Sequence, residues 1–353
     1  MHAVLDKLVR QQPLREEEAR SAMLRIMAGE ATSAQIAAFV TALRMKGETV
    51  EEIAGCARAM RDMVTPVEVK GSAVALESDG LDAAEGIVVD TCGTGGDGAD
   101  TFNISTAVAF VAAGAGLTVA KHGNRAVSSK CGSADVLERL GVNLALHPTQ
   151  VKRCIDEIGI GFLFAPVYHL AMRHAAGPRR ELAFRTVFNL LGPLANPAGA
   201  NVQVLGVYAP DLTDKMAAVL ARLGTRRALV VHGHGTQDEI ALTGPTVVSE
   251  TDGRSVRTYT VTPDDFGMRT VRAEDLAGGD ADHNAAILRG VFNGESGPRA
   301  DAVIVNAAAV FVVAGMAPTL AGGARRAREE LRSGRPRAKL EALVDLSRRL
   351  AQA

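Results

Sequence analysis

The first residues that could do chemistry lie in the segment 87–98, IVVDTCGTGGDG, where an apolar run precedes four glycines within six positions. Such spacing (G-x-G-x-x-G) is typical of dinucleotide-binding turns and, more generally, of loops that a ligand approaches closely. A dinucleotide site also needs an acidic residue about 20 positions further on, but Asp and Glu are absent between Thr101 and Ala134. A P-loop would carry lysine where this chain has Ala99, and Cys92 has no evident base to make it a nucleophile. The pattern therefore predicts a different kind of ligand loop, with a structural glycine turn as the alternative.

A basic segment follows the next apolar run. Residues 121–129, KHGNRAVSS, combine Lys121 and Arg125 with small residues, and Lys130 comes directly after them. Cations interleaved with small residues suit a polyphosphate, because backbone N–H groups and charges can then approach it together. A solvated basic loop is the alternative, and Ser133 can serve the ligand, cap the following helix or do both.

Oxygen ligands for Mg²⁺ are available in two places. Residues 103–106, NIST, open a helix whose free N–H groups favour an anion and whose hydroxyls can reach a metal. Asp238 and Glu239 follow an apolar run and are the hard ligands that Mg²⁺ prefers, although surface acidic pairs are common. His232 and His234 have the spacing of a transition-metal pair but lack an evident third ligand, so we do not predict such a site.

The elements that must position these loops fall into two groups. Helices are predicted at 16–28, 33–45 and 51–63, and after residue 66 strands alternate with helices, which indicates parallel pairing. The expected strands are 87–90, 117–120, 202–208 and 228–231, with a hairpin at 247–261 and helices at 107–115, 134–140, 215–223, 281–292, 303–313, 320–332 and 338–350. Two helical segments, 150–158 and 169–180, lack a strand partner and are expected to pack back onto the N-terminal helices.

The predicted fold class is therefore α/β, with a small all-helical N-terminal domain and a larger α/β domain around a mainly parallel central sheet. We place the helical domain at 1–66, completed by helices from about 163–182, and the α/β domain at 67–353. Ligands of open α/β sheets bind beyond the carboxyl ends of the strands, which is where the three loops fall.

Composition narrows the classes of function. The chain has 353 residues, 39 basic and 40 acidic, so a net charge of −1 creates no field that would draw it to nucleic acid or an anionic membrane. The longest uncharged apolar stretches, 107–120 and 302–317, are too short for a membrane span. Four cysteines without paired spacing favour a reducing compartment, and we expect a cytoplasmic protein.

Six motifs together resemble the anthranilate phosphoribosyltransferase family, whose fold is of the nucleoside phosphorylase type. They are GTGGD at 93–97, NIST at 103–106, KHGNRAVSS at 121–129, GSADVLERLG at 132–141, RTVFNLLGPLANP at 185–197 and DEI at 238–240. The resemblance implies transfer of phosphoribosyl from phosphoribosyl pyrophosphate to the amine of anthranilate in tryptophan biosynthesis. It also implies Mg²⁺ as cofactor and a homodimer joined through the helical domain.

The resemblance assigns roles residue by residue. Contacts to phosphoribosyl pyrophosphate are implied for Gly93, Gly96, Asp97, Thr101, Asn103, Ile104, Ser105, Thr106, Lys121, His122, Gly123, Asn124, Arg125, Ala126, Val127, Ser128, Ser129 and Ser133. Anthranilate contacts are implied for Gly93, Asn124 and Arg179. Mg²⁺ ligands are implied for Ser105, Asp238 and Glu239. No acid or base is assigned, although His122 is a possible general base.

Two departures from the family pattern accompany these matches. The family usually has HG-x-DGLDE before its metal carboxylates, where this chain has HGHGTQDE, and Pro178 precedes Arg179 in place of an apolar residue. A pyrimidine nucleoside phosphorylase is the nearest rival, but it usually carries K-x-S-G-R where this chain has KHGNR. A nucleic-acid-binding relative without activity is a second rival, which the net charge disfavours.

Overall fold

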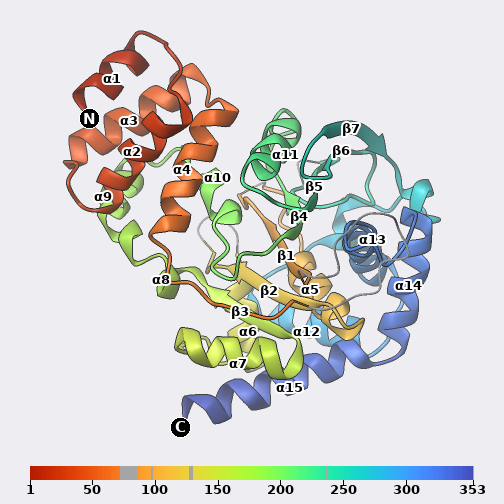
Figure 1. The fold of residues 1–353 in the computed structure, drawn as a ribbon. Coiled ribbons are helices and arrows are strands. Elements are labelled where there is room, and N and C mark those ends of the chain that lie inside the picture. The colour runs from red at the N-terminus through yellow and green to blue at the C-terminus, as the bar shows by residue number, and fades with distance from the viewer. Residues whose placement is uncertain (72–85, 97, 127–129, 236, 353) are drawn as a thin grey trace.

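The computed structural model describes residues 1–71, 86–96, 98–126, 130–235 and 237–352, and it combines a helical region with an α/β region (Figure 1). Residues 77–85, ESDGLDAAE, whose composition predicts an exposed acidic loop, lie outside the described residues. The helices are α1 His2–Val9, α2 Glu16–Met27, α3 Ser33–Lys46, α4 Val50–Asp62, α5 Ile104–Gly114, α6 Ser133–Leu140, α7 Pro148–Ile158, α8 Ala165–Tyr168, α9 Arg173–Leu182, α10 Phe188–Leu191, α11 Leu212–Arg222, α12 Ala281–Phe292, α13 Pro298–Val313, α14 Leu320–Arg332 and α15 Arg335–Ala351.

The N-terminal helices begin where side chains cap them. Thr32 and Thr49 each accept a hydrogen bond from the backbone N–H three residues on, and Gln35 and Glu52 each accept one in return from the N–H of the cap residue, which satisfies donors that a helix start leaves free. Apolar residues at helical spacing, such as Met23 and Phe39, are then fully enclosed between the helices. Helix α9 from later in the chain packs against α2 and α3.

A seven-stranded sheet forms the centre of the α/β region, in the order β3-β2-β1-β4-β5-β6-β7. The strands are β1 Val88–Gly93, β2 Thr118–Gly123, β3 Ile160–Phe164, β4 Val202–Gly206, β5 Arg227–Gly233, β6 Thr246–Thr251 and β7 Val256–Val261. The first five strands of that order, from β3 through β2, β1 and β4 to β5, pair in parallel. Strands β6 and β7 form the predicted antiparallel hairpin on the edge. The mainly parallel sheet is confirmed.

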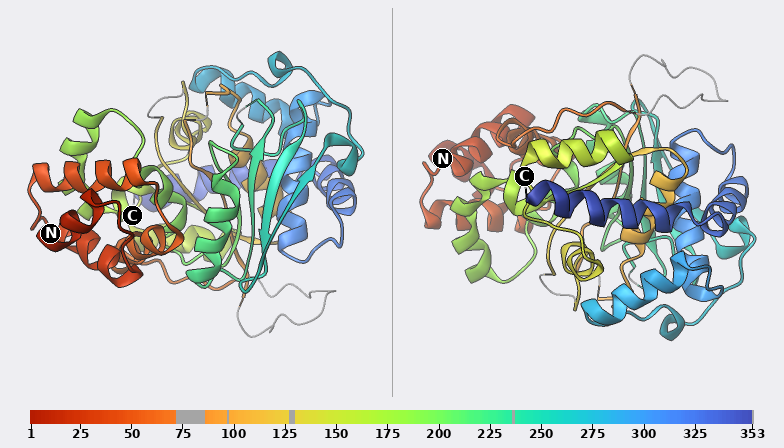
Figure 2. Two further views of the ribbon diagram at one scale, coloured as in Figure 1. Left: turned by 90° about the horizontal axis from the view of Figure 1, so that it is seen from above. Right: turned by 90° about the horizontal axis from the view of Figure 1, so that it is seen from below.

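Alternate strand residues face two different cores, as a period of two requires. Leu229 and Val231 of β5 belong to the cluster that includes α5, α13 and α15, while Val230 belongs to the cluster shared with α11 and the N-terminal helices. Both faces of the sheet are therefore covered by helices (Figures 1 and 2). This burial on both faces explains the near-continuous apolar runs of the central strands.

The prediction for residues 150–158 is wrong. Helix α7 does not pack onto the N-terminal helices; it leads directly into β3, which the sequence analysis missed, and it contacts β3 and α15 (Figure 2, right). Gly159 adopts a left-handed φ of +79° and turns the chain at once from helix to strand. The apolar residues Val151 and Ile155 consequently face β3, where Gly161 leaves room for Ile155.

No helix within the described ranges is both long and apolar enough to cross a bilayer.

Candidate active site

The glycine loop and the acidic pair meet at the ends of β1 and β4. Gly93 and Gly206 are register partners in these strands. A Cβ on Gly206 would lie 1.4 Å from the Asp238 carbonyl oxygen, and one on Gly93 would lie 2.2 Å from Asp238 Oδ2. Only glycine allows so close an approach, so both positions are needed to seat the segment that follows β5.

Hydrogen bonds connect this acidic pair with the other two elements. The Gly95 N–H donates to Asp238 Oδ2 at 2.8 Å, and the Ser105 N–H at the start of α5 donates to Glu239 Oε1 at 3.1 Å. Ser105 therefore lies beside the Asp238–Glu239 pair, although it is far from that pair in the sequence. A small void of about 10 Å³, roughly one water in size, is lined by Ser105 and Glu239 among others.

The chemistry of these groups fits Mg²⁺. Two carboxylates and a hydroxyl are hard oxygen ligands, and Mg²⁺ usually takes only one or two protein carboxylates and keeps water or phosphate in its other positions. The described residues contain no cluster of three or more His, Cys, Asp or Glu side chains, so they form no closed metal cage.

The divergent segment before the acidic pair is compact. Gly233 and Gln237 form an isolated antiparallel bridge, in which the Gly233 N–H donates to the Gln237 carbonyl at 2.8 Å. The His234 N–H donates to the Pro245 carbonyl at 2.9 Å, so the segment is tied to the residue directly before β6. After this segment, Asp238 still reaches the glycine loop and Glu239 the start of α5.

Lys121 lies near the end of β2, inside the protein. Its ammonium donates to the Thr91 carbonyl and, at 3.3 Å, to the Ser105 hydroxyl. Burial lowers the pKa of Lys121, and the nearby carboxylates of Asp90, Glu239 and Asp238 oppose that shift. The cation therefore lies beneath the predicted metal ligands.

Asp90 and Asn196 hold this strand end and were not predicted as site residues. Asp90 is fully buried and accepts from the His122 N–H at 3.1 Å and from Asn196 Nδ2 at 2.8 Å. Burial is the main cause of the raised pKa of Asp90, which Lys121 and these hydrogen bonds counteract. The sequence did offer a signal for both residues: Asp90 ends the apolar run before the glycine loop, and Asn196 lies in the 185–197 motif.

His122 and His169 form a buried pair. His122 Nδ1 lies 3.1 Å from the Gly192 carbonyl oxygen and therefore carries the proton, so its Nε2 accepts from His169 Nε2 at 3.2 Å. His169 Nδ1 has no hydrogen-bond partner in the described structure. Burial lowers the pKa of His122 to about 3 and that of His169 to about 4. Protein groups thus occupy both ring nitrogens of His122.

The cations of the basic loop already have partners. Arg125 pairs with Asp135 and Glu138, both at 2.9 Å, and Lys130 pairs with Asp100 at 3.3 Å. They are exposed, and a phosphate would have to compete with these carboxylates for them.

Small groups of the loop are closely packed. The Ser133 hydroxyl donates to the Asn124 carbonyl at 3.3 Å, and a Cβ on Gly123 would meet Ser133 Oγ at 2.2 Å. Asn103 Nδ2 donates to the Cys131 carbonyl at 3.1 Å, which ties the start of α5 to the basic loop. The start of α5 and the basic loop therefore lie side by side, as expected for segments that follow neighbouring strands.

Other predicted contacts are less direct. Ile104 and Thr106 are buried, so only their main chain can face a ligand, and Thr101 forms an isolated bridge with Ala277. Gly96 lies within the glycine loop and Ala126 donates its N–H to Asp135. The predicted residues Asp97, Val127, Ser128 and Ser129 lie outside the described residues.

Arg179 belongs to the helical region, where α9 packs against α2 and α3. It lies on α9, and its guanidinium carbon is 5.2 Å from the centre of the Phe188 ring. Burial lowers the pKa of Arg179, and within the described ranges it forms no ion pair. Pro178 is the sixth residue of α9 rather than its first, so it does not set the helix start. No hydrogen bond between described residues joins Arg179 to Asn124.

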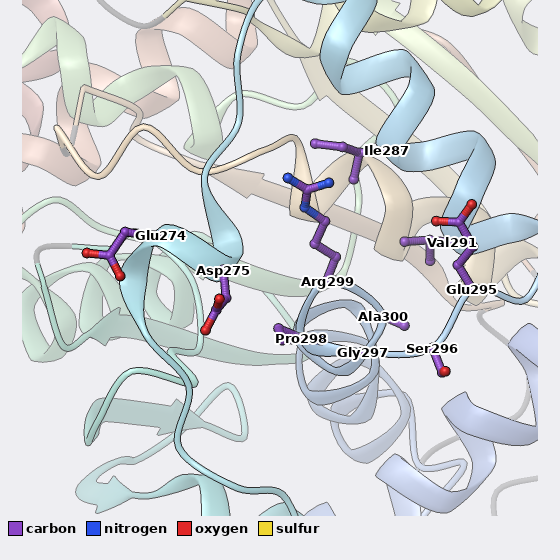
Figure 3. Close-up of a pocket in the computed structure, with 10 residues that line it drawn as sticks. All are labelled: Glu274, Asp275, Ile287, Val291, Glu295, Ser296, Gly297, Pro298, Arg299 and Ala300. Atoms are coloured by element: carbon purple, nitrogen blue, oxygen red, sulfur yellow. The ribbon is translucent and has the colours of Figure 1, made fainter.

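A cavity beside the 274–275 turn is lined by none of the residues predicted for the site (Figure 3). It measures about 410 Å³ and is lined by residues of the 274–275 turn, the end of α12 and the start of α13. None of its charged or polar lining residues is deeply buried. It is a surface hollow and has no part in the site.

Comparison with known proteins agrees with this geometry. Models of the glycosyl transferase family match the chain over its α/β domain at 85–337 and its helical bundle domain at 2–64. The anthranilate phosphoribosyltransferases of Moorella thermoacetica and Geobacter sulfurreducens are both 55% identical, over 98% and 97% of this chain and 97% of each relative. This chain belongs to the anthranilate phosphoribosyltransferase family.

Solved structures of the anthranilate phosphoribosyltransferase family share the fold along the whole chain. The Thermus thermophilus structure has a TM-score of 0.89 at 46% identity, covering 98% of this chain and 99% of that one. A Saccharomyces cerevisiae structure in complex with PRPP and Mg has a TM-score of 0.86 at 28% identity, covering 98% and 97%. Another from the same yeast is in complex with 4-fluoroanthranilate, with a TM-score of 0.83 at 27% identity, covering 98% and 96%.

Proposed function

We propose that this chain transfers the phosphoribosyl group of phosphoribosyl pyrophosphate to the amine of anthranilate, which gives N-(5′-phosphoribosyl)anthranilate and pyrophosphate in tryptophan biosynthesis. The observation that carries the proposal is the meeting of Gly95, Ser105, Asp238 and Glu239 at adjoining strand ends. It is supported by relatives of that name at 55% identity over almost the whole chain.

Phosphoribosyl pyrophosphate would bind at the glycine loop, the start of α5 and the basic loop. Backbone N–H groups there can donate to phosphate oxygens, and the helix start favours negative charge. The buried Lys121 adds a positive charge directly below. The residues predicted above for this substrate remain our assignment.

Ser105, Asp238 and Glu239 would hold Mg²⁺. When bound, the ion offsets the charge of the departing diphosphate. The cofactor assignment rests on the oxygen ligands of this chain, and the PRPP and Mg complex of the yeast relative supports it.

Anthranilate would bind near Gly93, Asn124 and Arg179. The guanidinium of Arg179 has no carboxylate partner among the described residues, and a carboxylate is the group that it binds best through two hydrogen bonds. Positioning the weakly nucleophilic amine against the sugar carbon supplies much of the rate, so no side-chain nucleophile is required. We assign no general base, because a His122 pKa of about 3 makes it a poor proton acceptor at neutral pH.

We also infer a homodimer through the helical domain, in which Val9 and Met45, 74% and 75% exposed, would be covered by the second copy. The domain limits at 1–66 with 163–182, and at 67–353, remain our division of the chain. The cytoplasm is our inferred compartment, since the four cysteines are free and buried.

A fluorescence assay tests the function. Loss of anthranilate fluorescence should require anthranilate, phosphoribosyl pyrophosphate and Mg²⁺ together, with each omitted in turn. Phosphorolysis of thymidine or uridine in place of this reaction would support the rival phosphorylase and refute the proposal.

The metal assignment has its own test. Asp238→Ala and Glu239→Ala should raise the Mg²⁺ concentration needed for half-maximal rate and lower turnover by on the order of 100-fold, because charge stabilisation of the leaving group is lost. Asp264→Ala, which removes an exposed acid elsewhere, is the control. An unchanged Mg²⁺ titration in both variants would contradict the assignment.

A further inference from the structure

Arg185 and Tyr208 form a contact that none of the roles above uses. Arg185 follows α9 after Ala183, whose φ of +53° ends that helix, and Tyr208 follows β4. The guanidinium carbon of Arg185 lies 4.0 Å from the centre of the Tyr208 ring. The other cation–π pairs of the described residues have separations of 4.9 to 5.7 Å. The contact is therefore close enough for a favourable cation–π interaction.

Tyr208 is bonded directly to the glycine loop. Its N–H donates to the Thr94 hydroxyl at 3.1 Å, while the Thr94 N–H donates to the Gly206 carbonyl at 2.9 Å. The end of β4 thus holds Thr94 from two sides. Thr94 is the one residue of 93–96 with a side chain beyond hydrogen, so it is the place where side-chain contacts can set the conformation of this loop.

We propose that Arg185 is a positioning residue, which acts through the Tyr208 ring and the Thr94 hydroxyl to hold the glycine loop in place against the segment that follows α9. The proposal rests on the proposed function, since the glycine loop is there assigned to phosphoribosyl pyrophosphate. Arg185 lies in the same segment as Arg179, so the contact joins the two predicted substrate sites.

The residue types suit this role. A planar guanidinium stacks on an aromatic face in a way that a lysine ammonium does not. Arg185 forms no ion pair within the described part of the chain and is free to stack. Burial raises the pKa of Tyr208, so its ring is neutral at the pH of an enzyme assay.

Removal of either partner should loosen the loop. We expect Arg185→Met and Tyr208→Leu to raise the KM for phosphoribosyl pyrophosphate about threefold to tenfold, with kcat changed less than about twofold. The double variant should be no worse than either single one, because the two residues make one contact. Tyr208→Phe keeps the ring face and should stay close to wild type. Amide hydrogen exchange at Thr94 and Gly95 should accelerate in the first three variants.

Arg257→Met is the matched control, since it removes the Arg257–Tyr259 pair of β7 at 4.9 Å. Additive effects of Arg185→Met and Tyr208→Leu, or an equal KM change in the control, would overturn the proposal, as would a Tyr208→Phe variant as impaired as Tyr208→Leu. Should the wild type lack transferase activity, the proposed function fails, while the exchange rates at Thr94 and Gly95 still decide whether the contact holds the loop.

Discussion

The glycine loop and the basic loop lie at neighbouring strand ends but are held in different ways. Hydrogen bonds from main-chain N–H groups hold the glycine loop: Thr94 donates to the Gly206 carbonyl and Gly95 to the Asp238 carboxylate. Ion pairs close the basic loop, where exposed Arg125 binds Asp135 and Glu138.

The difference concerns what each loop can offer an anion. Glycine-loop amides carry no net charge, and at Gly93 the loop has no room for a side chain, because a Cβ there would lie 2.2 Å from Asp238 Oδ2. The cations of the basic loop are already neutralised by carboxylates, and exposed pairs of this kind contribute little to stability. The exposed ion pairs of the basic loop should therefore tolerate substitution, whereas Gly93 of the glycine loop should not.

Gly206→Ala should show the largest effect, because Gly206 ends β4 where Asp238 packs against it beside the glycine loop. A Cβ placed 1.4 Å from the Asp238 carbonyl oxygen must displace backbone. We expect a loss of about 3 kcal/mol or more in stability and at least about 100-fold in activity, measured by denaturant unfolding and the fluorescence assay. Gly177→Ala, where nothing lies within 4 Å, is the control and should not lower stability. A fully active Gly206→Ala would refute the tight packing.

His169→Gln tests the buried histidine after α8 that contacts His122 of β2. The pKa of His169 is lowered from 6.5 to about 4 in the folded state, so the unfolded chain binds a proton that the folded chain does not. Stability is complete above about pH 6.5 and falls by about 3 kcal/mol as the pH drops toward 4. The variant should lose much of this decline, as measured by urea unfolding between pH 7 and 4. An unchanged slope would show that His169 does not titrate in this way.

Gly95→Ala tests strain in the glycine loop rather than packing. Gly95 has a φ of +67° with open space around its Cα. The left-handed backbone costs alanine about 1 kcal/mol, and relief of that strain should displace the loop and raise the KM for phosphoribosyl pyrophosphate about fivefold. Gly95→Asn, which tolerates this conformation better, should change KM less. Gly224→Ala, with a φ of +84° and equal space, should lose similar stability but keep its KM.

Glu138→Gln should have the smallest effect and concerns the basic loop. Removing this carboxylate leaves Arg125 paired with Asp135 alone, so a phosphate meets less competition for it, and we expect the KM for phosphoribosyl pyrophosphate to fall by up to about threefold at low salt. Glu157→Gln, which breaks the exposed pair with Arg153 on α7, is the control. A higher KM in Glu138→Gln would mean that the ion pair supports binding instead of competing with it.

Local patterns predicted much of the fold because they depend on neighbours in sequence. The helices predicted at 33–45, 51–63 and 281–292 are confirmed as α3, α4 and α12, and Thr32 and Thr49 cap the first two. Strand β3 was missed because its five residues follow Gly159 with no polar alternation, so its short apolar run could not be distinguished from loop. Pairing with β2 is what makes it a strand.

The candidate site divides in the same way. Glycine spacing and the family motifs were sufficient to name the glycine loop, Ser105 and the Asp238–Glu239 pair. Nothing local indicated that Arg125 would be occupied by Asp135 and Glu138, or that Asp90 would lie buried under His122. The packing of elements that lie apart in the sequence determines which residues become partners.

The sequence by itself determined the alternation of helix and strand, the glycine-rich tips and the set of oxygen and amide groups available to a diphosphate and its metal. Only the tertiary structure decided which of these groups meet. Gly206 leaves room for Asp238 to contact the end of β1, which lies more than a hundred residues earlier in the chain. The physical reason is that conformational preference acts over a few residues, whereas close approach and charge pairing depend on distance in space.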